Sequence, residues 1–239
     1  MLPIKLICLP YAGGSVSMYR DWPRRTGQSI EVELIELAGR GSRYKEPVYK
    51  TFDEMIEDLF HKCKSAIGDS EFSFFGYSLG SIVAFELSRL FKIRLGKEPR
   101  HLFVAASNAP HISYEISQKQ FGNLSDEELD KKIIKMGGIP EEIKSNQNYF
   151  KLCMSLIRHD LKIACNYHYR NKPNQLGCDV TVLSGKEDPQ IDLKRITEWD
   201  NTTSEKCSYY FFEGNHFFIR DFDEEIIKLV GHQLKALTV

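Results

Sequence analysis

The sequence predicts an α/β fold with a mostly parallel central sheet flanked by helices. Short apolar segments recur along the first half of the chain, and a segment with helical periodicity follows most of them. Strands that alternate with helices in this way are joined by crossover connections, which make the strands parallel. The stretch 72–75 is also almost without polar residues, as expected for a strand covered on both faces.

The first half of the chain shows this order of elements. We expect strands at 4–9, 30–37, 72–75 and 101–106, with helices near 18–22, at 51–67 and at 81–94. The helix at 51–67 is the clearest, since its apolar residues recur at the i, i+3, i+4 spacing of one buried face. Thr51 and Glu54 have the spacing of a capping box, and Gly68 is suited to end the helix.

A helical block interrupts the alternation of strands and helices between residues 110 and 172. Ser125 and Glu128 predict the start of one helix there, 137–140 predicts its end, and a longer helix is expected at 148–169. The second half then continues with strands at 179–184 and 208–212 and with helices near 193–199 and at 224–237. We therefore expect one domain, 1–239, in which 110–172 is inserted as a helical lid over one end of the sheet.

Composition excludes several classes of protein. The 239 residues are 42% hydrophobic, which is enough for one sizeable core, and the formal charge of −1 provides no basic field for nucleic acid. No stretch of about 18 apolar residues is present, so no membrane partner is expected. The six cysteines lack metal-ligand spacing, and we interpret them as free thiols. The simplest expectation is a cytoplasmic monomer without a metal site.

The segment 72–82, FSFFGYSLGSI, contains the strongest catalytic motif. Gly76, Ser78 and Gly80 match G-x-S-x-G, the nucleophile elbow of the α/β-hydrolase fold. In that elbow a strand turns sharply into a helix, and the serine hydroxyl projects from the turn. The pattern alone is short, but a buried strand precedes it here and an amphipathic helix follows it. We therefore predict an α/β-hydrolase fold with Ser78 as nucleophile.

A serine hydroxyl requires a base, and the base requires an orienting carboxylate. In this fold the expected chain order is Ser, then Asp or Glu, then His. His216 is the histidine that lies late in the chain in a loop directly after a predicted strand, and it is our candidate base. Asp188 follows the strand at 179–184 and is our candidate acid, with Glu187 and Asp192 as its competitors.

Two backbone N–H groups are expected to form an oxyanion hole. One belongs to Leu79, the residue after the nucleophile, and the other to the loop that follows the first strand. Within that loop Ala12 is our choice of donor, and Gly13 is its rival.

Several segments together resemble the type II thioesterases, the discrete α/β-hydrolases that accompany nonribosomal peptide and polyketide synthases. They span essentially the whole chain and read CLPYAGGS, ELAGRGSRYKEP, FFGYSLGS, LSDEELDKKIIKMGGIP, GKEDP and FEGNHFFI. The resemblance implies hydrolysis of acyl groups from the phosphopantetheine arm of carrier domains, without a further cofactor. It also places the triad on Ser78, Asp188 and His216, and the oxyanion donors on Ala12 and Leu79.

Other functions share the same triad. A general carboxylesterase or lipase of this fold and a product-releasing thioesterase stay open, and a binding module without activity is a third alternative. A carrier domain with acidic surface would need a basic docking face. Eight basic residues are candidates for it, although ordinary solvated charges are the preferred interpretation: Arg20, Arg24, Arg25, Arg40, Arg43, Lys131, Lys132 and Lys135.

Overall fold

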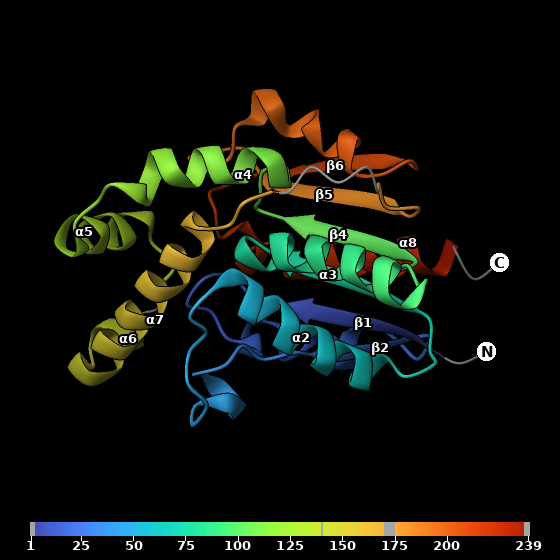
Figure 1. Ribbon diagram of the computed structural model, residues 1–239, viewed down its shortest axis with the longest axis horizontal. Helices are drawn as coiled ribbons and strands as arrows, with labels where there is room; N and C mark the ends of the chain where they lie inside the picture. The colour runs from blue at the N-terminus through green and yellow to red at the C-terminus, as the bar shows by residue number, and fades with distance from the viewer. Residues whose placement is uncertain (1–2, 140, 170–174, 237–239) are drawn as a thin grey trace.

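A six-stranded parallel sheet forms the centre of the molecule (Figure 1). The computed structural model describes residues 3–139, 141–169 and 175–236. The strand order is β2-β1-β3-β4-β5-β6, and every neighbouring pair is parallel. The strands are β1 (Ile4–Leu9), β2 (Ile30–Leu34), β3 (Phe72–Tyr77), β4 (His101–Ala105), β5 (Asp179–Gly185) and β6 (Cys207–Phe212). The predicted α/β-hydrolase architecture, with a parallel sheet between helices, is confirmed.

Helices cover both faces of this sheet, as Figure 1 shows. On one face lie α2 (Phe52–Ile67) and α3 (Leu79–Leu95), and on the other lies α8 (Asp223–Ala236). Along β3, Phe74 packs into the core shared with α2 and α3, whereas its neighbour Phe75 packs into the core shared with α8. Alternate side chains of the strand therefore enter two different cores, and each buried phenylalanine contributes about 1.5–3 kcal/mol.

Most bounds in the first half of the chain shift by only one or two residues, and two places differ more from the prediction. The expected helix at 18–22 is split into a 3₁₀ turn, η1 (Val16–Tyr19), and α1 (Trp22–Arg25), because Pro23 favours the start of a new helix. The second strand ends at Leu34 instead of residue 37. Beyond it Glu36 leaves the sheet, where its carboxylate accepts a hydrogen bond from the Ser15 hydroxyl at 2.6 Å.

The helix caps follow the sequence with one change. The Thr51 hydroxyl accepts the Glu54 N–H at 3.1 Å, but the Glu54 carboxylate accepts the N–H of Lys50 instead of that of Thr51. At α5 (Asp126–Met136) the capping box of Ser125 and Glu128 is complete.

The helical block between β4 and β5 lies beyond the carboxyl ends of the strands (Figure 1). It consists of α4 (Pro110–Ser117), the short π-helix η3 (Gln118–Gly122), α5, α6 (Glu141–Lys144) and α7 (Gln147–Cys165). No strand occurs within 110–139 or 141–169. The expected long helix ends at Cys165 instead of residue 169, and residues 140 and 170–172 of the predicted block lie outside the described residues. A separate apolar cluster holds η3, α5, α6 and α7 together, whereas Ile112 of α4 belongs to the main core.

Short 3₁₀ segments complete the chain: η2 (Gly41–Arg43), η4 (Leu193–Thr202) and η5 (Phe218–Arg220). The last helix ends at Ala236, so residue 237 of the predicted range lies outside the described residues. All six cysteines are free thiols. Within the described ranges no helix is long and apolar enough to cross a membrane.

Candidate active site

Ser78 stands in the sharp turn between β3 and α3. Its backbone has φ 55° and ψ −116°, a conformation that residues with a side chain rarely adopt. Gly76 and Gly80 make the turn possible, since a Cβ on Gly76 would lie 2.2 Å from the Gly80 carbonyl oxygen. A Cβ on Gly80 would in turn lie 2.4 Å from the Leu9 carbonyl oxygen at the end of β1. Both glycines of the motif are therefore required by close backbone contacts.

A continuous hydrogen-bond chain connects Ser78, His216 and Asp188. The His216 Nε2 lies 3.0 Å from the Ser78 Oγ, and its Nδ1 lies 2.7 Å from the Asp188 Oδ2. A carboxylate can only accept hydrogen bonds, so Nδ1 carries the ring hydrogen and Nε2 is left to accept the serine proton. Asp188 is 4% exposed and His216 is 5% exposed, which places the pair away from competing water.

Further hydrogen bonds fix the His216 backbone and the Asp188 side chain. The Tyr77 hydroxyl donates to the His216 backbone carbonyl at 2.6 Å, and burial raises the pKa of Tyr77, so this donor stays protonated. The Asp188 Oδ1 accepts the Gln190 N–H at 2.9 Å. Tyr77 is the middle residue between Gly76 and Ser78, and sequence analysis missed its role because no local pattern shows where its hydroxyl points.

The competing acids lie elsewhere. Glu187 has an exposed side chain, and its backbone N–H donates to the Gly214 carbonyl at 3.0 Å. Asp192 caps η4 by accepting the Lys194 N–H at 3.2 Å. Of the three candidates, Asp188 is therefore the one whose carboxylate contacts His216.

The residues that carry the two predicted oxyanion donors, Ala12 and Leu79, both lie beside Ser78. Leu79 is the first residue of α3, and the N–H groups of a first helical turn have no acceptor within the helix. The N–H of Ala12 donates to no acceptor in the described part of the chain, whereas that of its rival Gly13 donates to Asp160 at 2.6 Å. Ala12 and Leu79, the predicted donors, line one cavity with Ser78.

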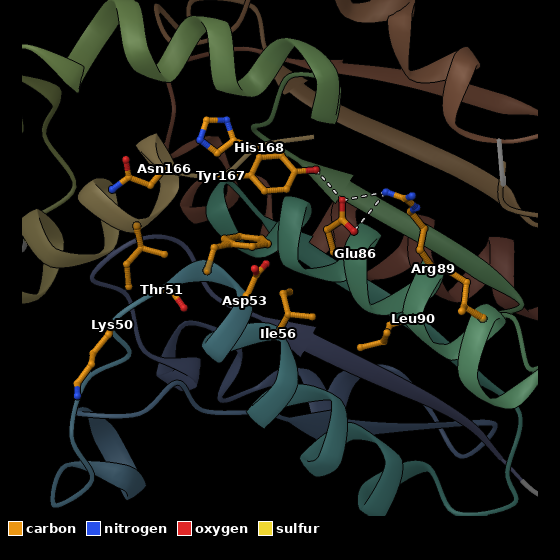
Figure 2. A pocket seen from close by; sticks show the side chains of 13 residues that line it. Lys50, Thr51, Asp53, Ile56, Glu86, Arg89, Leu90, Asn166, Tyr167 and His168 are labelled. Carbon is orange, nitrogen blue, oxygen red and sulfur yellow. Dashed lines mark hydrogen bonds and ion pairs between the residues drawn. The ribbon is translucent and has the colours of Figure 1, made fainter. Parts of the chain in front are cut away.

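Two small cavities flank the serine. One of about 80 Å³ runs between α3, α4 and α7 and is lined by Ala12, Ser78, Leu79, His216 and mainly apolar side chains. The other, of about 40 Å³, lies toward α5 and Phe217. A larger groove of about 380 Å³ lies outside, between α2, α3 and the end of α7, and includes none of the three triad residues (Figure 2). Among described residues, no group of three His, Cys, Asp or Glu side chains is placed to hold a metal.

Two of the basic residues considered for a docking face are buried. Arg40 is 4% exposed and pairs with Asp160, which is fully buried. Arg43 is 9% exposed and pairs with Glu46 and Asp58. Neither guanidinium can contact a partner surface, and neither is solvated. The interpretation as a docking face and the interpretation as solvated charges were therefore both wrong for these two side chains. The reason is that each guanidinium bridges segments that are separate in sequence.

Residues 4–234 match the family described as Thioesterase domain. The chain belongs to this family. The thioesterase is 31% identical over 238 residues to the human medium-chain S-acyl fatty acid synthase thioesterase, covering 98% of this chain and 88% of the relative. It is 29% identical over 239 residues to linear gramicidin dehydrogenase LgrE of Brevibacillus parabrevis, covering 99% of this chain and 89% of that one.

A solved structure shares nearly the whole fold of the thioesterase. The crystal structure of ClbQ from the colibactin NRPS/PKS pathway superimposes with a TM-score of 0.89 at 26% identity, covering 99% of this chain and 98% of ClbQ. The resemblance to thioesterases inferred from the sequence segments is therefore confirmed, and the chain is a hydrolase of thioesters.

Proposed function

We propose that this thioesterase hydrolyses acyl groups from the phosphopantetheine arms of carrier domains in a nonribosomal peptide or polyketide assembly line. Ser78 is the nucleophile, His216 the base and Asp188 its orienting acid. The observation that carries the proposal is the hydrogen-bond chain from Asp188 through His216 to Ser78, which opens onto a cavity beside the serine.

The first half of the reaction forms an acyl-enzyme. The Ser78 oxygen attacks the thioester carbonyl while His216 Nε2 takes the hydroxyl proton. The negative charge that develops on the carbonyl oxygen is stabilised by the N–H groups of Ala12 and Leu79. The carbon–sulfur bond then breaks, and the pantetheine sulfur leaves as a thiol after receiving the proton held by His216. Because thiolates are good leaving groups, this proton transfer matters less than it does in amide cleavage.

The second half releases the acid. Water enters the site of the departed thiol and gives a proton to His216 as its oxygen attacks the acyl-serine. The ester bond breaks, Ser78 recovers its proton from His216, and a carboxylic acid leaves. Every step uses protein groups and water, so the proposed cycle requires no cofactor.

The relatives support the choice of substrate. ClbQ belongs to an NRPS/PKS pathway, and the human relative is a fatty acid synthase thioesterase. LgrE is named a dehydrogenase, but a dehydrogenase of dinucleotide type would need a G-x-G-x-x-G turn, and the sequence has none. Hydrolysis at Ser78 therefore accounts better for this chain than oxidoreduction does.

The test measures free thiol released from an acyl-loaded carrier protein. Ser78→Ala should lose nearly all turnover while it still binds the acyl carrier, and a fluorophosphonate should label the wild type but not the variant. An active Ser78→Ala enzyme would rule out this mechanism.

A matched simple ester separates the proposal from a general carboxylesterase. We expect kcat/KM for the carrier thioester to exceed that for an ester with the same acyl group. The opposite order would favour the carboxylesterase.

A further inference from the structure

Helix α7 rests directly on the loop that carries the proposed oxyanion donor. Asp160 of α7 accepts the Gly13 N–H, with 2.6 Å between nitrogen and Oδ2. Ile157, one turn earlier on the same helix, packs so closely that a Cβ on Gly13 would lie 2.1 Å from its Cγ1. Two residues of one helix face therefore contact the residue that follows Ala12.

A buried ion pair with Arg40 fixes the position of the Asp160 carboxylate that accepts the Gly13 N–H. Both terminal nitrogens of Arg40 bond the Asp160 carboxylate, and the Nη2–Oδ1 distance is 2.9 Å. Arg40 also donates from Nη1 to the Gly14 carbonyl at 3.3 Å. The Arg40–Asp160 pair thus holds an N–H and a carbonyl of the same loop at once.

The loop itself is a tight turn with Ala12 at its corner. The Gly14 N–H donates to the Tyr11 carbonyl at 2.8 Å, and Gly13 has φ +73°, the left-handed region that glycine tolerates. Since Gly13 and Gly14 are held by Asp160 and Arg40, the direction of the adjacent Ala12 N–H depends on that pair. Neither charged side chain lines the cavities beside Ser78.

We propose that Arg40 and Asp160 are positioning residues, which orient the oxyanion donor Ala12 and couple it to helix α7. The inference rests on the proposed function, because it assigns the pair to the oxyanion site of that reaction. An oxyanion donor acts only in the transition state, so its misplacement lowers kcat and leaves substrate binding nearly unchanged.

The experiment compares kcat, KM and the affinity for an alkylboronic acid. A boronic acid bonded to Ser78 is tetrahedral and places an oxygen in the oxyanion hole. Asp160→Ala should lower kcat by about 10- to 100-fold, leave KM within about twofold, and weaken boronic acid binding by a similar factor. Asp160→Asn retains an oxygen that can accept the Gly13 N–H and should recover part of the loss.

Removal of one buried charge can prevent folding, so a second variant removes both. Arg40→Met combined with Asp160→Leu leaves no unpaired charge in the interior. This double variant should fold and still show the kcat and boronic acid defects, because the Gly13 N–H has lost its acceptor. Arg158→Met is the matched control, since it breaks an ion pair of α7 with Asp130 of α5 that does not reach the loop.

The outcomes separate the two proposals. A folded Asp160→Ala or double variant with wild-type kcat overturns the positioning role, as does a loss of kcat with unchanged boronic acid affinity. A wild-type enzyme that releases no thiol from any acyl carrier instead contradicts the proposed function.

A second, independent feature is an aromatic wall, formed by Phe52 and Tyr167, on the opposite side of the active-site cavity. Both side chains line the cavity of about 80 Å³ beside Ser78 and also the outer groove of about 380 Å³. Their ring centroids lie 4.7 Å apart, and the residues are 6% and 4% exposed. The aromatic wall therefore separates an inner cavity from a larger outer space.

A hydrogen bond to α3 holds the aromatic wall in place. The Tyr167 hydroxyl donates to the Glu86 carboxylate at 2.7 Å, and Glu86 is paired with Arg89 one turn later (Figure 2). Tyr167 follows directly after the last turn of α7, so the aromatic wall joins α2, α3 and the end of α7.

We infer that the aromatic wall sets an upper limit to the length of the acyl chain that the inner cavity accepts. The inner cavity of about 80 Å³ is much smaller than the outer groove of about 380 Å³, and the two rings lie at the boundary between them. This inference assigns specificity-determining residues to the proposed function and rests on it. Removing either ring joins the inner cavity to the outer groove, where a longer chain can extend.

The experiment measures kcat/KM for butyryl and dodecanoyl carrier thioesters. Tyr167→Ala and Phe52→Ala should raise the dodecanoyl-to-butyryl ratio by at least about tenfold, since each further methylene gains contact with apolar surface. Tyr167→Phe retains the ring and should keep the wild-type ratio. Ile93→Ala is the matched control, because this exposed side chain lines the outer groove alone.

An unchanged ratio in folded Tyr167→Ala or Phe52→Ala overturns the inference, and so does a wild type that hydrolyses both substrates equally. If the alanine variants do not fold, Tyr167→Leu and Phe52→Leu replace them with the same expected direction. A wild type that hydrolyses neither substrate contradicts the proposed function instead.

Discussion

The Tyr77 hydroxyl donates a 2.6 Å hydrogen bond to the backbone carbonyl of His216, which links the residue before the proposed nucleophile to the proposed base. Tyr77 is fully buried at the end of β3, and its ring also packs against Phe218 after the histidine loop. The strand that positions Ser78 therefore positions His216 as well, although the two residues are 138 positions apart in the chain.

Tyr77→Phe should lower kcat by about tenfold and destabilise the fold by about 1–3 kcal/mol. The variant keeps the ring but leaves the buried His216 carbonyl without its donor, so the imidazole is held less firmly. Steady-state kinetics and urea unfolding measure the two effects. Tyr210→Phe is the control, because its hydroxyl accepts from Gln233 far from the site; equal kinetics for the two variants would contradict the role of Tyr77.

Asp188→Asn should lower kcat by about 10²- to 10⁴-fold with little effect on folding. An amide at this position can donate to Nδ1 and favour the tautomer in which Nε2 carries the hydrogen and cannot accept the serine proton. The neighbouring Glu187→Gln, on an exposed side chain, should retain wild-type kcat. Thiol-release assays on both variants decide between them, and a larger loss in Glu187→Gln would reverse the assignment of the acid.

Ser78→Gly should be more stable than Ser78→Ala by about 1–2 kcal/mol. Both variants lack the nucleophile, but only glycine adopts φ 55° without strain from a Cβ. Chemical denaturation of the two inactive proteins measures the difference directly. Equal midpoints and slopes would mean that the elbow stores no backbone strain at this residue.

Stability should fall in acid partly because of His101, a buried residue of β4. Burial lowers the pKa of His101 from 6.5 to about 4, and its Nε2 lies 2.8 Å from the Thr181 hydroxyl oxygen. The unfolded chain therefore binds this proton first, so the stability that neutral His101 contributes is present above pH 6.5 and is lost as pH falls through 4. The shift is equivalent to about 3 kcal/mol.

His101→Phe isolates that contribution. We expect the difference in unfolding free energy between wild type and variant to change by about 3 kcal/mol between pH 7 and pH 4, in favour of the variant at low pH. Urea denaturation at a series of pH values provides the measurement. A difference that is constant with pH would show that His101 does not titrate in this range.

Local patterns were sufficient for the order of strands and helices and for the sharp turn at Ser78, the proposed nucleophile. Glycines on both sides of Ser78, an apolar strand before it and a periodic helix after it are neighbours in the chain, so the sequence displays them together. His216 could also be selected from the sequence, because it follows a strand late in the chain. The end of β2 was placed wrongly. Its position depends on where this edge strand stops pairing with β1, which the sequence of β2 does not show.

Folding was needed to choose between residues that look alike in the sequence. Ala12 and Gly13 are adjacent, and Gly13 is excluded as a donor because Asp160, which is 147 positions away, occupies its N–H. Arg40 resembles a surface charge in the sequence, yet it is buried against the same carboxylate. Such choices depend on side chains from distant segments that compete for the same hydrogen bonds. A pattern of neighbouring residues does not show which distant side chains these are.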